Sequence, residues 1–178
     1  MASFPTVLIR RARPADAAAL REVIYDTHES TWFPQVTLQA VQRFRAEAPP
    51  AAYIASRLGE FRVAECDGEV VGFVDWAGDF VHALHVRSSH ARMGIGRRLM
   101  DEAEAEIARA GHAKVRLETD TFNARSRAFY AARGYREMDQ YPDKVWDSGL
   151  TTLLLEKTPA GPGPRGRFWV LGQRKTPP

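Results

Sequence analysis

The sequence contains a single cysteine, Cys66, among its 178 residues. One cysteine cannot form an intrachain disulfide, and it excludes a zinc site built from several cysteines. Because Cys66 ends the apolar run FRVAEC, we expect a buried, inert thiol there and no nucleophile. His82 and His85 are spaced by three, which puts them on opposite faces of a strand, and they lack a set of acidic partners, so we predict no metal site.

Long apolar segments and runs of like charge are also missing. No segment approaches the length that spans a bilayer, and the N-terminus lacks the apolar stretch of a secretion signal, so we expect a cytoplasmic protein that binds no membrane. The formal net charge of +3 is spread along the chain, which favours a solvated surface of mixed charge over nucleic-acid binding. Arginine outnumbers lysine and alanine is abundant, as is typical of a bacterial protein from a GC-rich genome.

Periodicity and turn signals predict one globular domain of mixed α/β class. The hydrophobic content of 44% is sufficient for a core. Strands are expected at 7–11, 61–66, 69–76, 80–87, 115–119, 135–138 and 150–156, with a two-residue hairpin turn at Asp67-Gly68. Helices are expected from Pro14 to Thr27, at 37–48 before Pro49-Pro50, at 51–58 before a capping Gly59, from Ile95 to near Gly111, and at 123–133 before a capping Gly134. The alternation of strands and helices in the second half predicts a mixed sheet with helices on both faces.

The composition changes after the last predicted strand. From Thr158 the chain reads TPAGPGPRGR, so we expect a domain over residues 1–157 and a Pro/Gly-rich tail over residues 158–178. The apolar patch Phe168–Leu171 in this tail belongs either to a loose segment or to one that docks on the sheet or on a neighbouring subunit. No internal repeat is present.

The most informative segment joins a predicted strand to the long helix through Gly94 and Gly96. A helix start carries unpaired N–H groups and the positive end of the helix dipole, and glycine lets phosphate oxygens approach them. Arg92, Arg97 and Arg98 add positive charge. The segment therefore predicts an anion site, most naturally for a pyrophosphate, although two glycines also suit a simple tight turn. It is not a nucleoside triphosphatase loop, which requires GxxxxGK[ST].

This loop resembles the phosphate loop of GNAT N-acetyltransferases, [QR]-x-x-G-x-[GA], with Gly94 and Gly96 on its glycines and Ala91 departing from its first position. Residues 123–135 resemble the second GNAT signature, N-x-x-[SA]-x-x-[FL]-Y-x-x-x-G-[FY], at every position. The two motifs occur in the expected order, one helix and one strand apart. The resemblance covers roughly Val7 to Glu156 and implies a centrally splayed, mixed β-sheet of about seven strands with helices on both faces.

The resemblance also implies a function and a cofactor site. It implies an N-acetyltransferase that transfers the acetyl group of acetyl-CoA, a co-substrate, to a primary amine of a small molecule or peptide by direct attack in a ternary complex. A non-catalytic acyl-CoA-binding module is the alternative, and dimers are common in the family. The residues implied to contact acetyl-CoA are Leu84, His85, Val86, Arg92, Met93, Gly94, Ile95, Gly96, Arg97, Asn123, Ser126 and Tyr130.

Three residues are predicted to take part in catalysis. Tyr130 matches the family's general acid, and a phenol with a pKa near 10 can protonate a departing thiolate. The acceptor amine must lose a proton, for which His82 and Glu118 are candidate bases; His82 also matches a proposed base of the arylalkylamine N-acetyltransferases. Strand alternation puts His82 on the face of Leu84 and Val86. Each histidine also suits a structural role, and Glu118 also suits pairing with an arginine.

The acceptor site is expected under the first two helices, from Asp16 to Leu58, as in the family. The residues considered for its walls are Tyr25, His28, Glu29, Trp32, Phe33 and Phe44. Trp32 and Phe33 suit a pocket for an apolar or aromatic amine, and Glu29 suits a cation, although all three also suit core or lid packing. The sequence leaves the identity of the acceptor open.

Overall fold

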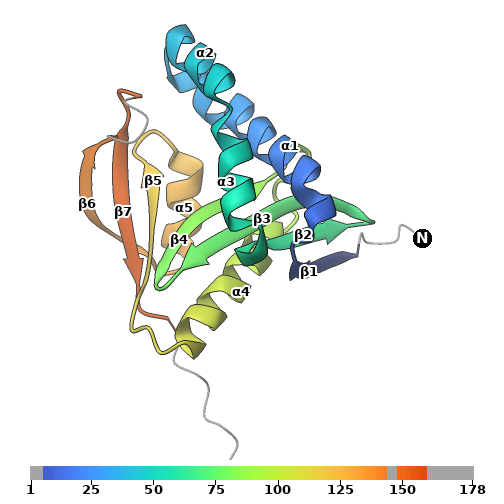
Figure 1. Cartoon of the computed structure of the whole chain (residues 1–178). Coiled ribbons are helices and arrows are strands. Elements are labelled where there is room, and N and C mark those ends of the chain that lie inside the picture. The colour runs from blue at the N-terminus through green and yellow to red at the C-terminus, as the bar shows by residue number, and fades with distance from the viewer. Residues whose placement is uncertain (1–5, 144–147, 160–178) are drawn as a thin grey trace, which may run out of the picture.

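Seven strands form a single sheet in the computed structural model, which describes residues 6–143 and 148–159. The strands are β1 (Val7–Arg11), β2 (Arg62–Cys66), β3 (Glu69–Ala77), β4 (Phe80–Val86), β5 (Val115–Asp120), β6 (Arg136–Pro142) and β7 (Thr151–Lys157). Their order across the sheet is β1-β2-β3-β4-β5-β7-β6, and every neighbouring pair is antiparallel except β4 and β5. The predicted mixed sheet is confirmed (Figure 1).

Helices cover both faces of this sheet (Figure 1). The α-helices are α1 (Ala17–Thr27), α2 (Leu38–Glu47), α3 (Pro49–Arg57), α4 (Ile95–Arg109) and α5 (Ala124–Ala132). Between α1 and α2 the chain forms a turn of π-helix, η2 (His28–Trp32), and a turn of 3-10 helix, η3 (Phe33–Gln35). Helices α1 and α3 pack on one face, and α4 and α5 pack on the other. Among the described residues, no helix has both the length and the apolar character that crossing a membrane requires.

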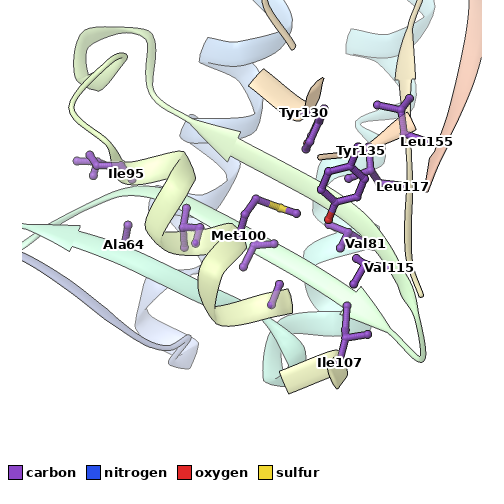
Figure 2. Packing of buried hydrophobic residues seen from close by; sticks show 14 of the residues in the cluster. Ala64, Val81, Ile95, Met100, Ile107, Val115, Leu117, Tyr130, Tyr135 and Leu155 are labelled. Atoms are coloured by element: carbon purple, nitrogen blue, oxygen red, sulfur yellow. The ribbon is translucent and has the colours of Figure 1, made fainter. Parts of the chain in front are cut away.

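The larger core lies between α4 and the sheet. Helix α4 buries one stripe of side chains at helical spacing, namely Ile95, Leu99, Met100, Ala103 and Ile107. They share one hydrophobic cluster with Val81 of β4, Leu117 of β5 and Leu155 of β7 (Figure 2). Because this stripe fixes α4 on the sheet, the N-terminus of the helix is held beside the end of β4.

On the opposite face, a row of stacked rings connects the core to α2. The ring centroids of Phe61 and Phe73 lie 4.9 Å apart, and His85 lies 5.1 Å from Phe73. His28 follows at 5.9 Å from His85, and Phe44 of α2 lies 4.5 Å from His28. These spacings are typical of offset-stacked rings. The stack holds the end of α1 against β4, and it reaches α2 although that helix has no buried residue.

Two predictions about the third helix require correction. The second helix does end before the proline pair, but α3 begins at Pro49 and not at Ala51. Proline suits the first turn of a helix because its missing N–H would have no partner there. The break lies at Ala48, whose φ of 46° is left-handed. Gly59 does not cap α3 in the left-handed conformation, because it lies in a following 3-10 turn without a positive φ.

The remaining boundaries agree with prediction, apart from two extensions. Turns η2 and η3 continue the helical segment beyond Thr27, the predicted end of the first helix. Strand β6 extends beyond Met138, its predicted end, to Pro142. Asp67 and Gly68 both have positive φ, 49° and 88°, so the two-residue hairpin turn is confirmed. Gly134 follows α5 with a φ of 88°, as predicted for its cap. The apolar patch Phe168–Leu171 lies outside the described residues.

Replacing Leu99 by alanine should lower the free energy of unfolding by about 2–5 kcal/mol, because it leaves a cavity in the core under α4. Leu99 is fully buried. Equilibrium urea denaturation measures the change. The matched control is Leu38→Ala, whose parent side chain is 72% exposed on α2. This control should change stability by less than about 0.5 kcal/mol. Equal stabilities of the two variants would contradict the core described here.

Candidate active site

Strands β4 and β5 separate after two paired positions. Phe80 pairs with Arg116 and Val81 with Leu117, and within the described residues no further pairing joins the two strands, although both continue. At His82, β4 has one residue more than β3 opposite it, which is a β-bulge. The predicted splay at the centre of the sheet is therefore confirmed. It leaves one edge of β4 without a neighbouring strand.

A cavity of about 1040 Å³ lies along this separation. Its walls come from β4, β5, the first turns of α4 and α5, and the segment from α1 to α3. All but one of the site residues predicted from the sequence line it: His82, Leu84, His85, Val86, Arg92, Gly94, Ile95, Gly96, Arg97, Glu118, Asn123, Ser126 and Tyr130. The exception is Met93, whose 43% exposed side chain is not part of the cavity wall.

The N-terminus of α4 presents backbone amides at this cavity. The first hydrogen bond within the helix runs from Arg98 N to Gly94 O at 3.1 Å, so the amides before it have no acceptor within the helix. Gly94 has a φ of 78°, a left-handed conformation that glycine adopts without strain. No side chain caps this helix start. The turn therefore offers N–H donors and the positive end of the helix dipole to an anion.

The fold itself does not require glycine at position 96. Its φ is not positive, and a Cβ built on Gly96 would lie 3.8 Å from Val86 Cγ2 and 3.9 Å from Phe129 Cζ. Both distances are ordinary van der Waals contacts. A small residue is thus accommodated at this position, beside Val86 and Phe129 on the cavity wall.

Two arginines flank this turn. Arg92 has a φ of 65°, a left-handed conformation that few residues other than glycine adopt. Arg97 lies 3.9 Å from Asp101 in an ion pair on the exposed side of α4. Both arginines also line the cavity, so they add positive charge beside the amides.

The start of α5 is capped by the side chain of Asn123. Asn123 Oδ1 accepts a hydrogen bond of 3.0 Å from Ser126 N. Ser126 Oγ in turn accepts a hydrogen bond of 3.0 Å from Thr119 Oγ1 of β5. These two bonds fix the first turn of α5 against β5, on the side of the cavity that faces β4.

Tyr130 of α5 borders the cavity from within the larger core. Its ring contacts those of Phe129 and Tyr135 at centroid distances of 5.1 and 5.4 Å, and its hydroxyl has no hydrogen bond to the described residues. Burial raises the pKa of Tyr130 above its usual value. The phenol is therefore protonated at neutral pH and has a proton to donate.

The strand residues predicted as bases differ in their surroundings. His82 is exposed at the bulge, its ring 5.2 Å from that of Phe80. The added residue at the bulge shifts the phase of β4, so alternation alone does not place His82 on the face of Leu84 and Val86, although all three residues line the cavity. Glu118 accepts a hydrogen bond from the hydroxyl of Tyr141. Across the described residues, no group of three or more His, Cys, Asp or Glu side chains could hold a metal ion.

His85 has its backbone on the cavity wall and its ring on the α1 face. The ring makes one hydrogen bond, of 2.6 Å, between Nδ1 and Thr27 Oγ1. Burial, and to a lesser extent the neighbouring His28, lower the pKa of His85 to about 3. The imidazole is therefore neutral at physiological pH. Thr27 was recognised from the sequence only as part of the apolar stripe of α1.

The segment after α1 forms the opposite wall. Of the residues considered for the acceptor site, His28, Trp32, Phe33 and Phe44 line the cavity, whereas Tyr25 and Glu29 do not. Glu29 instead pairs with Arg45 at 3.4 Å, so the expectation that it suits an acceptor cation is not supported by its position.

Sequence reasoning missed Asp120, at the end of β5. Trp32 Nε1 donates a hydrogen bond of 2.7 Å to Asp120 Oδ2, which joins η2 to β5 across the cavity. Burial raises the pKa of Asp120 above its usual value, and the bond from Trp32 opposes that rise. The two residues are 88 positions apart, so no local sequence signal identifies the contact.

A splayed sheet, an amide-lined turn and a buried tyrosine lie together beside one cavity, and comparison with known proteins identifies the family that has this fold. The model of the Acetyltransferase (GNAT) family matches residues 21–135. This chain belongs to the GNAT family, as its two sequence motifs indicated.

Individual relatives are named acetyltransferases, and a solved structure shares the fold. An uncharacterized N-acetyltransferase of Methanocaldococcus jannaschii is 30% identical over 147 residues, which cover 74% of this chain and 93% of the relative. The blasticidin-S acetyltransferase of Streptomyces morookaense is 32% identical over 107 residues, which cover 60% of this chain and 73% of the relative. The PaiA N-acetyltransferase of Thermoplasma acidophilum, solved in complex with coenzyme A, has the same fold, with a TM-score of 0.70 at 19% identity over 86% of this chain and 99% of its own.

Acidification should destabilise the protein through His85. Its folded-state pKa of about 3 lies below the unfolded value of 6.5, so between these values only the unfolded chain binds the proton. The contribution is complete above the unfolded pKa and is lost as the pH falls toward the folded one. At pH 5 this loss is about 2 kcal/mol relative to pH 7.

Urea denaturation at the two pH values measures this effect. The variant His85→Phe keeps a ring in the stack but cannot titrate, so it should lose less stability than the wild type on going from pH 7 to pH 5. An equal loss in both proteins would show that His85 binds its proton normally in the folded state.

Proposed function

We propose that this protein transfers the acetyl group of acetyl-CoA to a primary amine of a small molecule or peptide, by direct attack in a ternary complex. One observation carries the proposal. The open edge of β4 leads into the amide-lined turn at Gly94 and Gly96, and Tyr130 borders the same cavity. A thioester on a long, amide-containing arm that ends in a diphosphate matches this arrangement in shape and charge.

Acetyl-CoA fits the separation between β4 and β5 in two respects. Its diphosphate is a suitable anion for the amides at the start of α4, between Arg92 and Arg97. Its pantetheine arm carries amide groups, which can pair with the backbone of residues 84–86 as an added strand would. Asn123 and Ser126, on the facing side of the cavity, are proposed to contact the same arm.

The proposed reaction needs a donor for the oxyanion and an acid for the thiolate. Attack by the amine forms the C–N bond and a tetrahedral oxyanion, which a backbone N–H near Val86 stabilises. Collapse of this intermediate breaks the C–S bond, and Tyr130 donates its proton to the sulfur. The hydroxyl of Tyr130 has no hydrogen-bond acceptor among the described residues, so it is available for this role.

The amine must be deprotonated before it attacks, since an alkylammonium has a pKa of about 10.4. On the two strands, His82 and Glu118 are the candidate proton acceptors expected from the sequence, and both line the cavity. We propose that residues 1–157 carry this activity and that the protein acts in the cytoplasm. The proposed reaction involves no metal, membrane or nucleic acid. Turnover distinguishes this proposal from a non-catalytic acyl-CoA-binding module, which would share the same turn.

The variant Gly96→Glu should bind acetyl-CoA at least about tenfold more weakly, a loss of about 1.4 kcal/mol, because a carboxylate beside the turn obstructs its amides and repels a diphosphate. It should unfold no more easily than the wild type, since a Cβ there meets only ordinary contacts and an acidic residue suits the first turn of a helix better than glycine.

Thermal denaturation at increasing acetyl-CoA concentrations gives the dissociation constant of each protein. Gly59→Glu is the matched control, because a Cβ there meets nothing within 4 Å and the residue is not part of the cavity wall. Unchanged affinity in Gly96→Glu would argue against a diphosphate at this turn.

The variant Tyr130→Phe should lower kcat by about 10²–10⁴-fold with little change in the affinity for acetyl-CoA. Release of free thiol over a panel of amines measures the turnover. The neighbouring Tyr135 serves as the control, because its hydroxyl bonds to Glu104 at 3.0 Å and does not line the cavity. Tyr135→Phe should retain turnover within about threefold. If Tyr130→Phe is fully active, another group protonates the thiolate.

A further inference from the structure

One imidazole on the cavity wall, that of His28, has its tautomer fixed by the fold. Its Nδ1 lies 2.8 Å from the carbonyl oxygen of Ile24. A carbonyl oxygen only accepts hydrogen bonds, so Nδ1 carries the proton of the neutral ring. The second ring nitrogen, Nε2, therefore has a free lone pair, and it makes no hydrogen bond with the described residues.

His28 lies on the α1 face of the sheet, over the separation of β4 and β5. Its ring is 5.9 Å from that of His85, which belongs to β4. The ring of Trp32 lies 5.0 Å from that of His28 and 6.0 Å from that of His85, and its Nε1 bonds to Asp120 of β5. His28 and Trp32 thus connect the two separated strands on this face. Tyr130 borders the same cavity from the α4 face.

This placement puts a candidate acid and a candidate base on opposite faces of the sheet. A thioester held between β4 and β5 would have the phenol of Tyr130 on the α4 face and the imidazole of His28 on the α1 face. An amine that approaches from the α1 face passes the rings of His28 and Trp32. The free lone pair of His28 is thus on the side where the amine loses its proton, and the acid is on the side where the thiolate departs.

We propose that His28 is a catalytic residue, whose Nε2 accepts the proton of the acceptor ammonium before the amine attacks. This inference rests on the proposed acetyltransferase function and assigns the proton acceptor within it. The ammonium transfers one proton to Nε2, and its nitrogen then forms the C–N bond. As the C–S bond breaks, the thiolate takes the proton of Tyr130, and the second proton lost by nitrogen restores that phenol. His28 releases its proton to water, so the overall reaction yields the amide, the thiol and one H⁺.

The other candidate acceptors have features that weaken them. Glu118 is already engaged by the hydroxyl of Tyr141. The ring of His85 is stacked on those of Phe73 and His28, and its pKa of about 3 makes it a poor base at neutral pH. His82 is exposed at the bulge, where its ring lies 5.2 Å from that of Phe80.

The electrostatic surroundings of His28 also favour a neutral ring. Burial lowers the pKa of His28 below its usual value. The titratable and charged groups that line the cavity on the elements around it are His82 and His85 on β4, Glu118 and Asp120 on β5, and Arg43 and Glu47 on α2, and Glu29 of η2 pairs with Arg45 outside the cavity wall. Glu29 is neutralised by its pair with Arg45. The ring is therefore unprotonated, and able to accept a proton, at physiological pH.

The test compares His28→Asn with the wild type over a range of pH. Asparagine keeps an N–H that can reach the carbonyl of Ile24, but it has no counterpart of Nε2. We expect kcat/KM at pH 7 to fall by at least about 100-fold, the lower limit for losing a general base. The activity that is left should rise about tenfold per pH unit toward the pKa of the amine, because only the free amine then reacts. Thermal stabilisation by acetyl-CoA should not change.

Two further variants complete the experiment. His112→Asn, an exposed histidine that is not part of the cavity wall, is the matched control and should retain the wild-type pH profile. His28→Ala should regain activity when free imidazole is added, a response that a merely structural role would not give. If His28→Asn does not fold, the imidazole response of His28→Ala decides.

The inference is overturned if His28→Asn keeps the wild-type rate and pH profile, if imidazole fails to restore His28→Ala, or if His82→Asn shows the loss instead. In each of these cases the wild type still acetylates an amine, so the proposed function stands. A wild-type protein that binds acetyl-CoA without any turnover over the amine panel would overturn the proposed function itself, and the role of His28 with it.

Discussion

Strand β4 has a strand partner on both edges for only two positions, and the site depends on this half-open edge. Backbone N–H and C=O groups are obligatory hydrogen-bonding groups, so an edge beside a cavity is completed either by water or by a ligand with its own amides. The bulge at His82 marks where the separation begins. Helix α4 is held at the other end of the same edge by its buried stripe, which brings the turn at Gly94 and Gly96 into line with the strand.

The two faces of the sheet supply different chemistry to the one cavity. The α4 face carries the amides for an anion and the phenol of Tyr130, both fixed by the larger core. The α1 face carries the stack that runs from Phe61 to Phe44, with His28 near its outer end. The hydrogen bond from Trp32 to Asp120 closes this face over the gap. In the proposed reaction, the co-substrate and the acceptor approach the reacting carbon from separate sides.

The sequence predicted most of the fold, and it identified the residues that are proposed to contact acetyl-CoA, all of which except Met93 line the cavity, because both depend on local patterns. The stripe of α4, the turn at Asp67-Gly68 and the cap of Asn123 each rest on residues a few positions apart. The acceptor half depends on tertiary contacts instead. The pair Thr27–His85 is separated by 58 positions, and η2 joins β5 through a pair 88 positions apart. The bulge also defeats simple alternation, since one added residue reverses the face of every position beyond it.

The central claim, that acetyl-CoA completes the open edge of β4, is tested most directly by backbone amide chemical shifts during titration with acetyl-CoA. The account predicts that the largest changes occur in two segments, residues 84–86 of β4 and residues 94–97 at the start of α4, and that they saturate together. Saturable changes confined to other surfaces, or none at all at millimolar acetyl-CoA, would contradict it.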